Sequence, residues 1–230
     1  MVASQVEEAI IAGTFPVGSQ LPAEQQLADQ FGVSRNVIRE AFKFLKERGL
    51  IEILNGSGAY VRQPSGSPTS DALDRYLRLI GADTDIAALY EARSVLESTN
   101  VRLAAERATD QDLAHLADCI RRMTEHAGAI EAIGQWAEAD LDFHVGIAKA
   151  TQNPFLVVLL HPLVDRIRGV IAEGYLVPGA VDRGLDAHRK ILNFLLARDA
   201  AGADAAIRAH LNDSEASIRL FDAKVEKSER

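Results

Sequence analysis

The run from Leu21 to Val61 combines two short helical patterns, a glycine-containing turn and a hairpin pattern. Residues 23–30 are predicted to form a first helix, and residues 31–33 a turn of the kind that sets two helices at a steep angle. A second helix is expected to begin after Ser34, a good N-cap residue, and to end before Gly49. This order of elements predicts a winged helix-turn-helix, which is a DNA-binding fold.

The second helix has two distinct faces. Cations recur on one face at spacings of four, four and three, and apolar residues recur on the other; the cations are Arg35, Arg39, Lys43 and Lys46, and the apolar residues are Ile38, Ala41, Phe42 and Leu45. A helix-turn-helix would present the cationic face to a major groove, and arginine suits guanine there. The alternative is the solvated face of an ordinary surface helix. We expect contacts to double-stranded DNA from Ser34, Arg35, Asn36, Arg39 and Lys43.

A β-hairpin is expected after this helix, with strands at residues 50–54 and 59–62 and a turn at Asn55–Gly58. Gly56 and Gly58 have no side chain to hold the backbone away from a phosphate or a minor-groove wall, so we expect the hairpin tip to contact DNA.

Net charge must be considered locally in this chain. The whole chain carries −8, but residues 1–62 hold six Lys/Arg against seven Asp/Glu, a net of −1, so the remaining residues hold −7. Five of those six cations lie between Arg35 and Arg48. The local field of this helix, and not the global charge, is therefore what would attract phosphate.

The first sixty residues resemble the GntR family of bacterial transcription regulators. The resemblance rests on Ile11-Ala12-Gly13, on residues 16–24 (PVGSQLPAE), on Val33-Ser34-Arg35, on Ile38-Arg39-Glu40-Ala41 and on residues 56–61 (GSGAYV). Two departures stand out. The family often has Arg after the Leu-Pro-x-Glu element, where this chain has Gln25, and the chain starts several residues later than usual. The first departure removes one expected phosphate or base contact.

Residues 63–70 are rich in Pro, Gly and Ser, which is typical of a linker. We therefore expect a DNA-binding domain at 1–62, a linker at 63–70 and a second domain at 71–230 that serves effector binding and dimerisation. Every segment of the second domain has a helical pattern, with breaks at Gly81, Thr109, Gly128, Asn153-Pro154, Pro178-Gly179 and Gly202. The predicted fold class is mainly α, a winged helix followed by an all-α bundle of six or seven helices.

A cytoplasmic location is expected for this chain. No apolar run approaches the roughly 18 to 20 residues that a membrane span requires, and the N-terminus has a polar amphipathic pattern instead of a signal peptide. The single cysteine, Cys119, cannot form an internal disulfide, which fits a reducing compartment.

Polar residues interrupt the apolar faces of the predicted bundle. Asp140 and His144 lie four apart on the apolar row of residues 131–150, His188 lies on that of residues 182–198, and His210 lies on that of the last helix. A single histidine in such a row is usually a hydrogen-bonded core residue. One carboxylate and three imidazoles on three helices instead predict a divalent metal such as Zn²⁺ or Ni²⁺.

This second domain resembles the FCD effector domain of the FadR subfamily of GntR regulators. The resemblance rests on residues 90–97 (YEARSVLE), 140–144 (DLDFH), 150–154 (ATQNP), 187–192 (AHRKIL) and 209–210 (AH). It implies a metal site at Asp140, His144, His188 and His210, because metal-binding members use an Asp and three His at these motif positions. Four other residues do not match the motif and are expected near the site or on the surface, namely Asp142, His115, His126 and His161.

Arg93 shares a helical row with Leu89, Leu96 and Asn100, so its side chain is expected to point inward, where an arginine needs a partner. One interpretation is a structural ion pair with Glu97 or another acid. The other is a clamp for the carboxylate of a small effector. In the family that the chain resembles, this arginine approaches the effector site.

Together these features predict a homodimeric regulator, a repressor, that binds a palindromic operator and responds to a small organic or sugar acid beside the metal. Two alternatives remain. One is a metal-dependent hydrolase or lyase, since such a metal site is also found in enzymes, and the other is a regulator whose metal is purely structural.

Overall fold

The computed structural model describes residues 2–54, 56–63, 67–81 and 85–228. Asn55, predicted in the hairpin turn, and residues 64–66 of the expected linker lie outside the described residues. The chain divides into two compact units, Met1–Asp71 and Ala72–Arg230, which are considered separately below.

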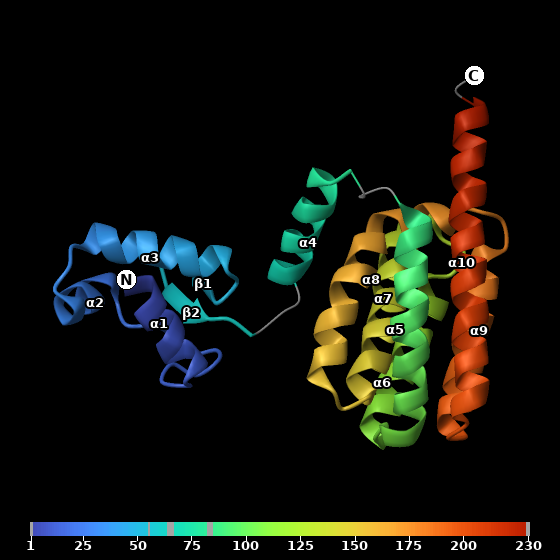
Figure 1. Cartoon of the computed structure of the whole chain (residues 1–230), viewed down its shortest axis with the longest axis horizontal. Coiled ribbons are helices and arrows are strands. Elements are labelled where there is room, and N and C mark those ends of the chain that lie inside the picture. Colours follow the sequence, from blue (N-terminus) through green and yellow to red (C-terminus); the bar gives the residue numbers. More distant parts are fainter. Residues whose placement is uncertain (1, 55, 64–66, 82–84, 229–230) are drawn as a thin grey trace. The chain divides into compact units, whose positions relative to one another are not determined.

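The first unit is a winged helix, as the sequence predicts (Figure 1). Its elements are α1 (Val2–Ile11), α2 (Glu24–Phe31), α3 (Arg35–Glu47), β1 (Ile51–Leu54) and β2 (Gly58–Val61). The strands pair antiparallel in the register Ile51 with Val61 through Leu54 with Gly58. The core draws buried residues from all five elements, among them Val6, Leu27, Ile38, Ile51 and Val61.

Two glycines shape the ends of α2 and α3. Gly32 ends α2 with φ 64°, and Gly49 follows α3 with φ 72°, both in the left-handed region that favours glycine. Ser34 occupies the N-cap position of α3 in an extended conformation, although its side chain makes no capping hydrogen bond. The predicted apolar face of α3 is buried, because Ile38, Ala41, Phe42 and Leu45 all face the core; these are the buried residues of this helix.

The second unit is a helical bundle. Its elements are α4 (Ser67–Leu79, which begins in the first unit), α5 (Ile86–Arg107), α6 (Asp110–His126), a 3-10 turn η1 (Ile130–Ala132), α7 (Ile133–Ala150), α8 (Pro154–Gly174), α9 (Ala180–Leu196) and α10 (Ala200–Ser228). Most ends fall at the predicted breaks. Thr109 caps α6 by a reciprocal hydrogen-bonded box with Asp112, and Asn153 Oδ1 accepts from the Phe155 amide at the start of α8.

Two helices, α4 and α10, begin earlier than the sequence indicates. Ser67–Ser70, expected in the linker, form the first turn of α4, so Pro68 stands near a helix N-terminus, where the missing N–H costs nothing. Gly202, expected as a break, lies inside α10, and the true break falls at residues 197–199. A Cβ on Gly202 would collide with Phe194 and with Asp199, so glycine is needed there for close packing and not for a turn.

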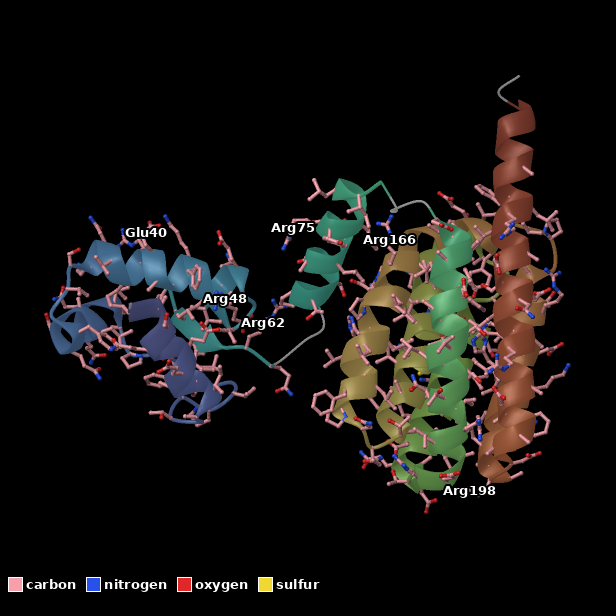
Figure 2. All side chains as sticks on the ribbon, viewed as in Figure 1. Glu40, Arg48, Arg62, Arg75, Arg166 and Arg198 are labelled. Atoms are coloured by element: carbon pink, nitrogen blue, oxygen red, sulfur yellow. The ribbon has the colours of Figure 1, made fainter. Side chains whose placement is uncertain are left out.

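The interior of the bundle is formed around α7, which packs against α5, α6 and α8, while α10 packs against α5, α8 and α9. Trp136, Phe143 and Leu116 are among the large side chains that are fully buried in this core. Arg198, labelled at one end of the bundle in Figure 2, donates to the carbonyl oxygens of Ala105 and Ala108 at 3.3 and 2.8 Å and thereby satisfies the C-terminus of α5. None of the described helices combines the length and apolar character needed to cross a membrane.

Candidate metal centre and nucleic-acid interface

A groove of about 850 Å³ lies between α3 and the hairpin wing of the first unit. Five of the seven residues predicted to contact DNA line it, namely Arg35, Arg39, Lys43, Gly56 and Gly58. The side chains of Arg35 and Arg39 are 58% and 53% exposed, which leaves both guanidinium groups able to reach a ligand. The groove therefore combines cations from the helix with bare backbone from the wing.

The other two predicted residues are not in this groove. Ser34 is exposed and lies outside the residues that line it. Asn36 lines a separate apolar depression with Val37 and Phe44, on another side of α3. Figure 2 shows Glu40 projecting from α3. The helical spacing explains this result, because residues 36, 40 and 44 follow a different row of α3 from residues 35, 39 and 43.

Glu24 is a component of this groove that sequence reasoning missed. Its carboxylate accepts from Arg39 Nε at 3.3 Å and Nη2 at 3.0 Å, and it lies 3.8 Å from Arg35 Nη2. The hydrogen bond and charge of Arg39 lower the pKa of Glu24, so the carboxylate is ionised at neutral pH. The available signal was the Leu-Pro-x-Glu element, which places an acid at the first turn of α2, beside α3. Gln25, the departure from the family pattern, donates to Asp29 Oδ1 at 2.8 Å.

Gln20 fixes the wing. Its Nε2 donates to the Ser57 carbonyl at 2.6 Å, and residue 20 also forms an isolated bridge with Tyr60 of β2. Gly58 has φ 113°, and a Cβ there would lie 2.7 Å from Gln20 Nε2. The glycine thus permits both the backbone conformation and the close approach of the side chain that holds the tip.

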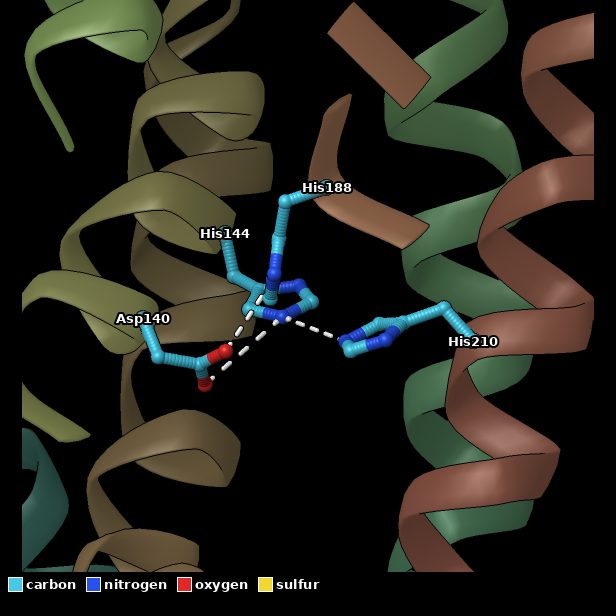
Figure 3. Close-up of side chains that lie close together, drawn as sticks. All are labelled: Asp140, His144, His188 and His210. Atoms are coloured by element: carbon cyan, nitrogen blue, oxygen red, sulfur yellow. Dashed lines mark hydrogen bonds and ion pairs between the residues drawn. The ribbon is translucent and has the colours of Figure 1, made fainter. Parts of the chain in front are cut away.

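In the second unit, four buried side chains from three helices converge (Figure 3). Asp140 and His144 come from α7, His188 from α9 and His210 from α10, and one candidate ligand atom from each lies within 4.8 Å of the others. His188 Nε2 is 3.0 Å from Asp140 Oδ1, His210 Nε2 is 3.3 Å from His144 Nε2, and His144 Nε2 is 3.9 Å from Asp140 Oδ2. The structure thus brings together the predicted set of one carboxylate and three imidazoles.

The set fits a divalent metal ion. Ligand atoms about 2.0 to 2.2 Å from a tetrahedral metal stand about 3.3 to 3.6 Å from one another, close to the separations observed. Asp140 Oδ2 is buried without a hydrogen-bond partner among the described residues, and the buried His188 Nε2 has none beyond its contact with Asp140 Oδ1. Unpaired polar atoms in a core are costly, and a cation at the centre of the cluster would satisfy them. Nitrogen and oxygen donors of this kind suit Zn²⁺, Ni²⁺ and their neighbours.

Two further side chains orient the cluster from outside. Tyr175 donates its hydroxyl to Asp140 Oδ1 at 3.1 Å, and Glu97 of α5 makes a short contact with His144 Nδ1. Contacts of this type fix the orientation of metal ligands. Glu97 is a second residue that sequence reasoning did not place at the site, although it stands in the motif at residues 90–97 and one helical turn after Arg93.

Electrostatics favour the ligating forms of these groups. Burial raises the pKa of Glu97, but the charge of Arg93 and the contact with His144 outweigh it and lower the pKa to about 2. Burial likewise opposes ionisation of Asp140, yet the hydrogen bond and charge of His188 lower its pKa. Burial, together with His188 and His144, lowers the pKa of His210 well below its usual value. The carboxylates are therefore ionised and His210 is a neutral imidazole at pH 7.

Arg93 is fully buried, as its helical row predicts. Its Nε donates to Glu97 Oε1 at 2.7 Å, so the structural ion pair considered from the sequence exists. That pair uses one nitrogen only. Nη1 and Nη2 are buried without a hydrogen-bond partner in the described part of the chain. The amide oxygen and nitrogen of Asn100, two helical turns further along α5, are also buried without a hydrogen-bond partner there. The ion pair therefore leaves Nη1 and Nη2, the fork of the guanidinium, able to donate hydrogen bonds to a ligand.

The residues that did not match the motif lie outside the four-residue cluster. Asp142 is exposed and pairs with Arg122 at 2.9 Å. His115 is exposed and lies 3.7 Å from the Sγ of the buried Cys119. His126 and His161 are half-buried.

Comparison with known proteins agrees with this architecture. Residues 1–61 match the gntR family of bacterial regulatory proteins, and residues 88–213 match the FCD domain. The HTH-type transcriptional regulator LutR of Bacillus subtilis is 34% identical over 209 residues, which cover 88% of this chain and 93% of LutR. The HTH-type transcriptional repressor NanR of Klebsiella aerogenes is 31% identical over 225 residues, 96% of this chain and 85% of NanR.

A solved structure shares the fold. The GntR protein of Streptococcus agalactiae superposes with a TM-score of 0.70 at 27% identity, covering 93% of this chain and 97% of that one. These relatives are named regulators and not enzymes, which argues against the hydrolase or lyase alternative. The chain belongs to the GntR family of bacterial transcriptional regulators, in the FadR-like group that carries an FCD effector domain.

Proposed function

We propose that this regulator is a homodimeric repressor that binds a two-fold symmetric operator and releases it when a small organic or sugar acid binds beside a divalent metal in the bundle. The observation that carries the proposal is the pairing of two features in one core: a cluster of four candidate metal ligands and an arginine whose two terminal nitrogens have no hydrogen-bond partner among the described residues.

Charge counting supports a metal together with an anionic ligand. The charged groups buried in the described part of the bundle are Arg93, Glu97 and Asp140, beside histidines that ligate in the neutral form. Their sum is −1, a divalent cation changes it to +1, and one carboxylate then neutralises it. Since isolated charge is expensive in a core, a monocarboxylate is the class of ligand that balances this site.

Different residues of the site would bind the metal and the acid. Asp140, His144, His188 and His210 would hold the metal, which when bound supplies positive charge and open coordination positions for oxygen donors. The free fork of Arg93 would bind the carboxylate through two parallel hydrogen bonds. Burial of all these groups strengthens each interaction, because water does not screen it.

On DNA, the groove between α3 and the wing would take the duplex. Arg35 and Arg39 are suited to guanine edges in the major groove, and Lys43 to a phosphate. Glu24 would hold Arg39 in position. A two-fold dimer predicts two half-sites related as an inverted repeat. Repression is supported by the name of the relative NanR.

Helix α4 is the element through which the two units would communicate, because it crosses the division at Asp71 and Ala72. Within the second unit, Asp74 of α4 forms an ion pair with Arg166 of α8. A shift of the bundle helices on ligand binding would move α4 and so change the spacing of the two wings. A coupling of only about 1 to 3 kcal/mol is enough to alter operator affinity 5- to 150-fold.

The test begins with selection of duplexes bound by the purified, Zn²⁺-loaded protein from a random pool. We expect an inverted repeat. Fluorescence anisotropy of a labelled selected duplex is then followed against a panel of small hydroxycarboxylic and sugar acids. Release by one acid class supports the proposal. DNA binding that ignores every acid, with a metal that only raises the melting temperature, would favour a purely structural metal.

A further inference from the structure

Glu97 lies between two residues that have separate tasks in the proposed function. Its side chain is 3% exposed, and its two oxygens face different partners. Oε1 accepts from Arg93 Nε at 2.7 Å, within α5, while Oε2 is in short contact with Nδ1 of His144 on α7. One carboxylate thus joins the candidate acid-binding arginine to a candidate metal ligand without belonging to the four-residue cluster itself.

The contact with His144 determines which ring nitrogen carries the proton. An ionised carboxylate only accepts, so the hydrogen of the neutral imidazole must sit on Nδ1. That leaves the lone pair on Nε2, the nitrogen that faces Asp140 and His210. Since a metal binds the nitrogen that has no hydrogen, Glu97 holds this ring in its ligating tautomer.

The contact with Arg93 determines which donors remain. Glu97 accepts from Nε and leaves Nη1 and Nη2, the two nitrogens that have no hydrogen-bond partner among the described residues. Because the guanidinium is planar, a fixed Nε also fixes the plane in which the other two nitrogens lie. The same carboxylate therefore orients the fork.

We propose that Glu97 is a shared positioning residue that sets the His144 tautomer and the Arg93 fork together, so that metal binding depends on a side chain that is not a metal ligand. The inference rests on the proposed function for the role of the metal. The shared carboxylate also couples the two sites in both directions. A ligand that moves Arg93 would shift His144 through Glu97, and a metal that binds His144 would shift Arg93 in the same way.

Glu97→Gln is the sharpest perturbation, because the amide has the same shape but only one acceptor oxygen. If that oxygen faces Arg93, the NH₂ group faces His144 Nδ1, which must then give up its hydrogen and move it to Nε2. If the oxygen faces His144, the NH₂ group opposes the Nε–H of Arg93 and displaces the guanidinium. The first arrangement is expected, because a charge-assisted hydrogen bond from Arg93 is stronger than one from a neutral imidazole, so the contact with His144 is the one that is lost. Glu91→Gln is the matched control, since Glu91 is an exposed acid on the same helix.

The first readout is the Zn²⁺ affinity of metal-stripped full-length protein, measured by competition with a chromophoric chelator. We expect Glu97→Gln to bind Zn²⁺ roughly 10- to 100-fold more weakly, the usual effect of removing a partner behind a metal ligand, and Glu91→Gln to match the unchanged protein. A merely structural Glu97 would lower the melting temperature and leave the Zn²⁺ affinity of the folded protein unchanged, which would overturn the proposal.

The second readout does not depend on the variant folding. The ¹⁵N shifts of the His144 ring in the unchanged, metal-stripped protein report its tautomer, and we expect the hydrogen on Nδ1. A hydrogen on Nε2 alone would overturn the role of Glu97. If the unchanged protein bound no Zn²⁺, the proposed metal site would fail, while the tautomer would still decide whether Glu97 positions His144.

Discussion

Replacing Asp140 with asparagine should abolish most of the stabilisation that a bound metal gives to the bundle. Asp140 is the anionic member of the cluster and is fully buried, and one of its oxygens, Oδ2, has no hydrogen-bond partner among the described residues. Asparagine keeps the size of the side chain and an acceptor for the Tyr175 hydroxyl. The substitution therefore removes the charge with little change in packing.

The magnitude follows from linkage. Zn²⁺ at 100 times its dissociation constant stabilises the folded form by about 2.7 kcal/mol. For a unit the size of Ala72–Arg230, each 1 kcal/mol raises the melting temperature by about 2 to 4 °C, so the expected shift is about 5 to 11 °C. If Asp140→Asn weakens binding about 100-fold, the same Zn²⁺ concentration supplies only about 0.4 kcal/mol, a shift of about 1 to 2 °C.

The assay is differential scanning calorimetry of metal-stripped protein with and without Zn²⁺. Asp142→Asn is the matched control, because Asp142 lies two residues further along α7, is exposed and pairs with Arg122 outside the cluster. We expect the control to keep the full shift. A full shift in Asp140→Asn, or none in the unchanged protein, would refute the assignment of the metal to these four residues.

Three further predictions test the roles of the DNA-binding groove, the metal cluster, Arg93 and the wing one at a time. Arg39→Ala should weaken binding to the selected duplex by about 1 to 3 kcal/mol without changing metal content, whereas His188→Ala should lower metal content without changing duplex binding. Anisotropy measures the first property and elemental analysis the second. Loss of both properties in either variant would contradict the assignment of DNA binding and metal binding to separate domains. Arg93→Lys keeps the positive charge beside Glu97 but removes the two terminal nitrogens of the guanidinium. The concentration of acid needed to release DNA should therefore rise about 10- to 150-fold, as expected for a lost charge-assisted hydrogen bond, while Zn²⁺ affinity stays nearly unchanged. An unaltered acid response would show that the guanidinium does not bind the acid. Gly58→Ala forces a side chain into a backbone with φ 113°, so duplex affinity should fall while the Zn²⁺-dependent melting shift of the bundle persists; wild-type affinity would mean that the conformation of the wing tip does not matter.

Features with a local physical cause could be predicted from the sequence. The ends of α3 are marked by an N-cap serine and a following glycine, and its two faces by the spacing of its side chains. Asp140 and His144 share a helix, so their four-residue spacing alone places both on one buried face. Each of these predictions required only the period of one helix.

Features that depend on how helices pack could not be predicted in the same way. The contact between Glu97 and His144 joins α5 to α7, and that between Glu24 and Arg39 joins α2 to α3, so neither follows from the period of a single helix. The role of Gly202 could not be predicted for a related reason, because the need for a small residue comes from Phe194 on a different helix. Periodicity shows which side of a helix faces inward, whereas the partner it meets there depends on the tertiary fold.

In the proposed function, the metal makes the regulator responsive to an acid. It is tested most directly by titrating the active acid into one labelled selected duplex bound to two preparations of the same protein, one stripped of metal and one reloaded with Zn²⁺, while anisotropy reports release. We expect both preparations to bind the duplex and only the reloaded one to release it. Equal release by both preparations would contradict it.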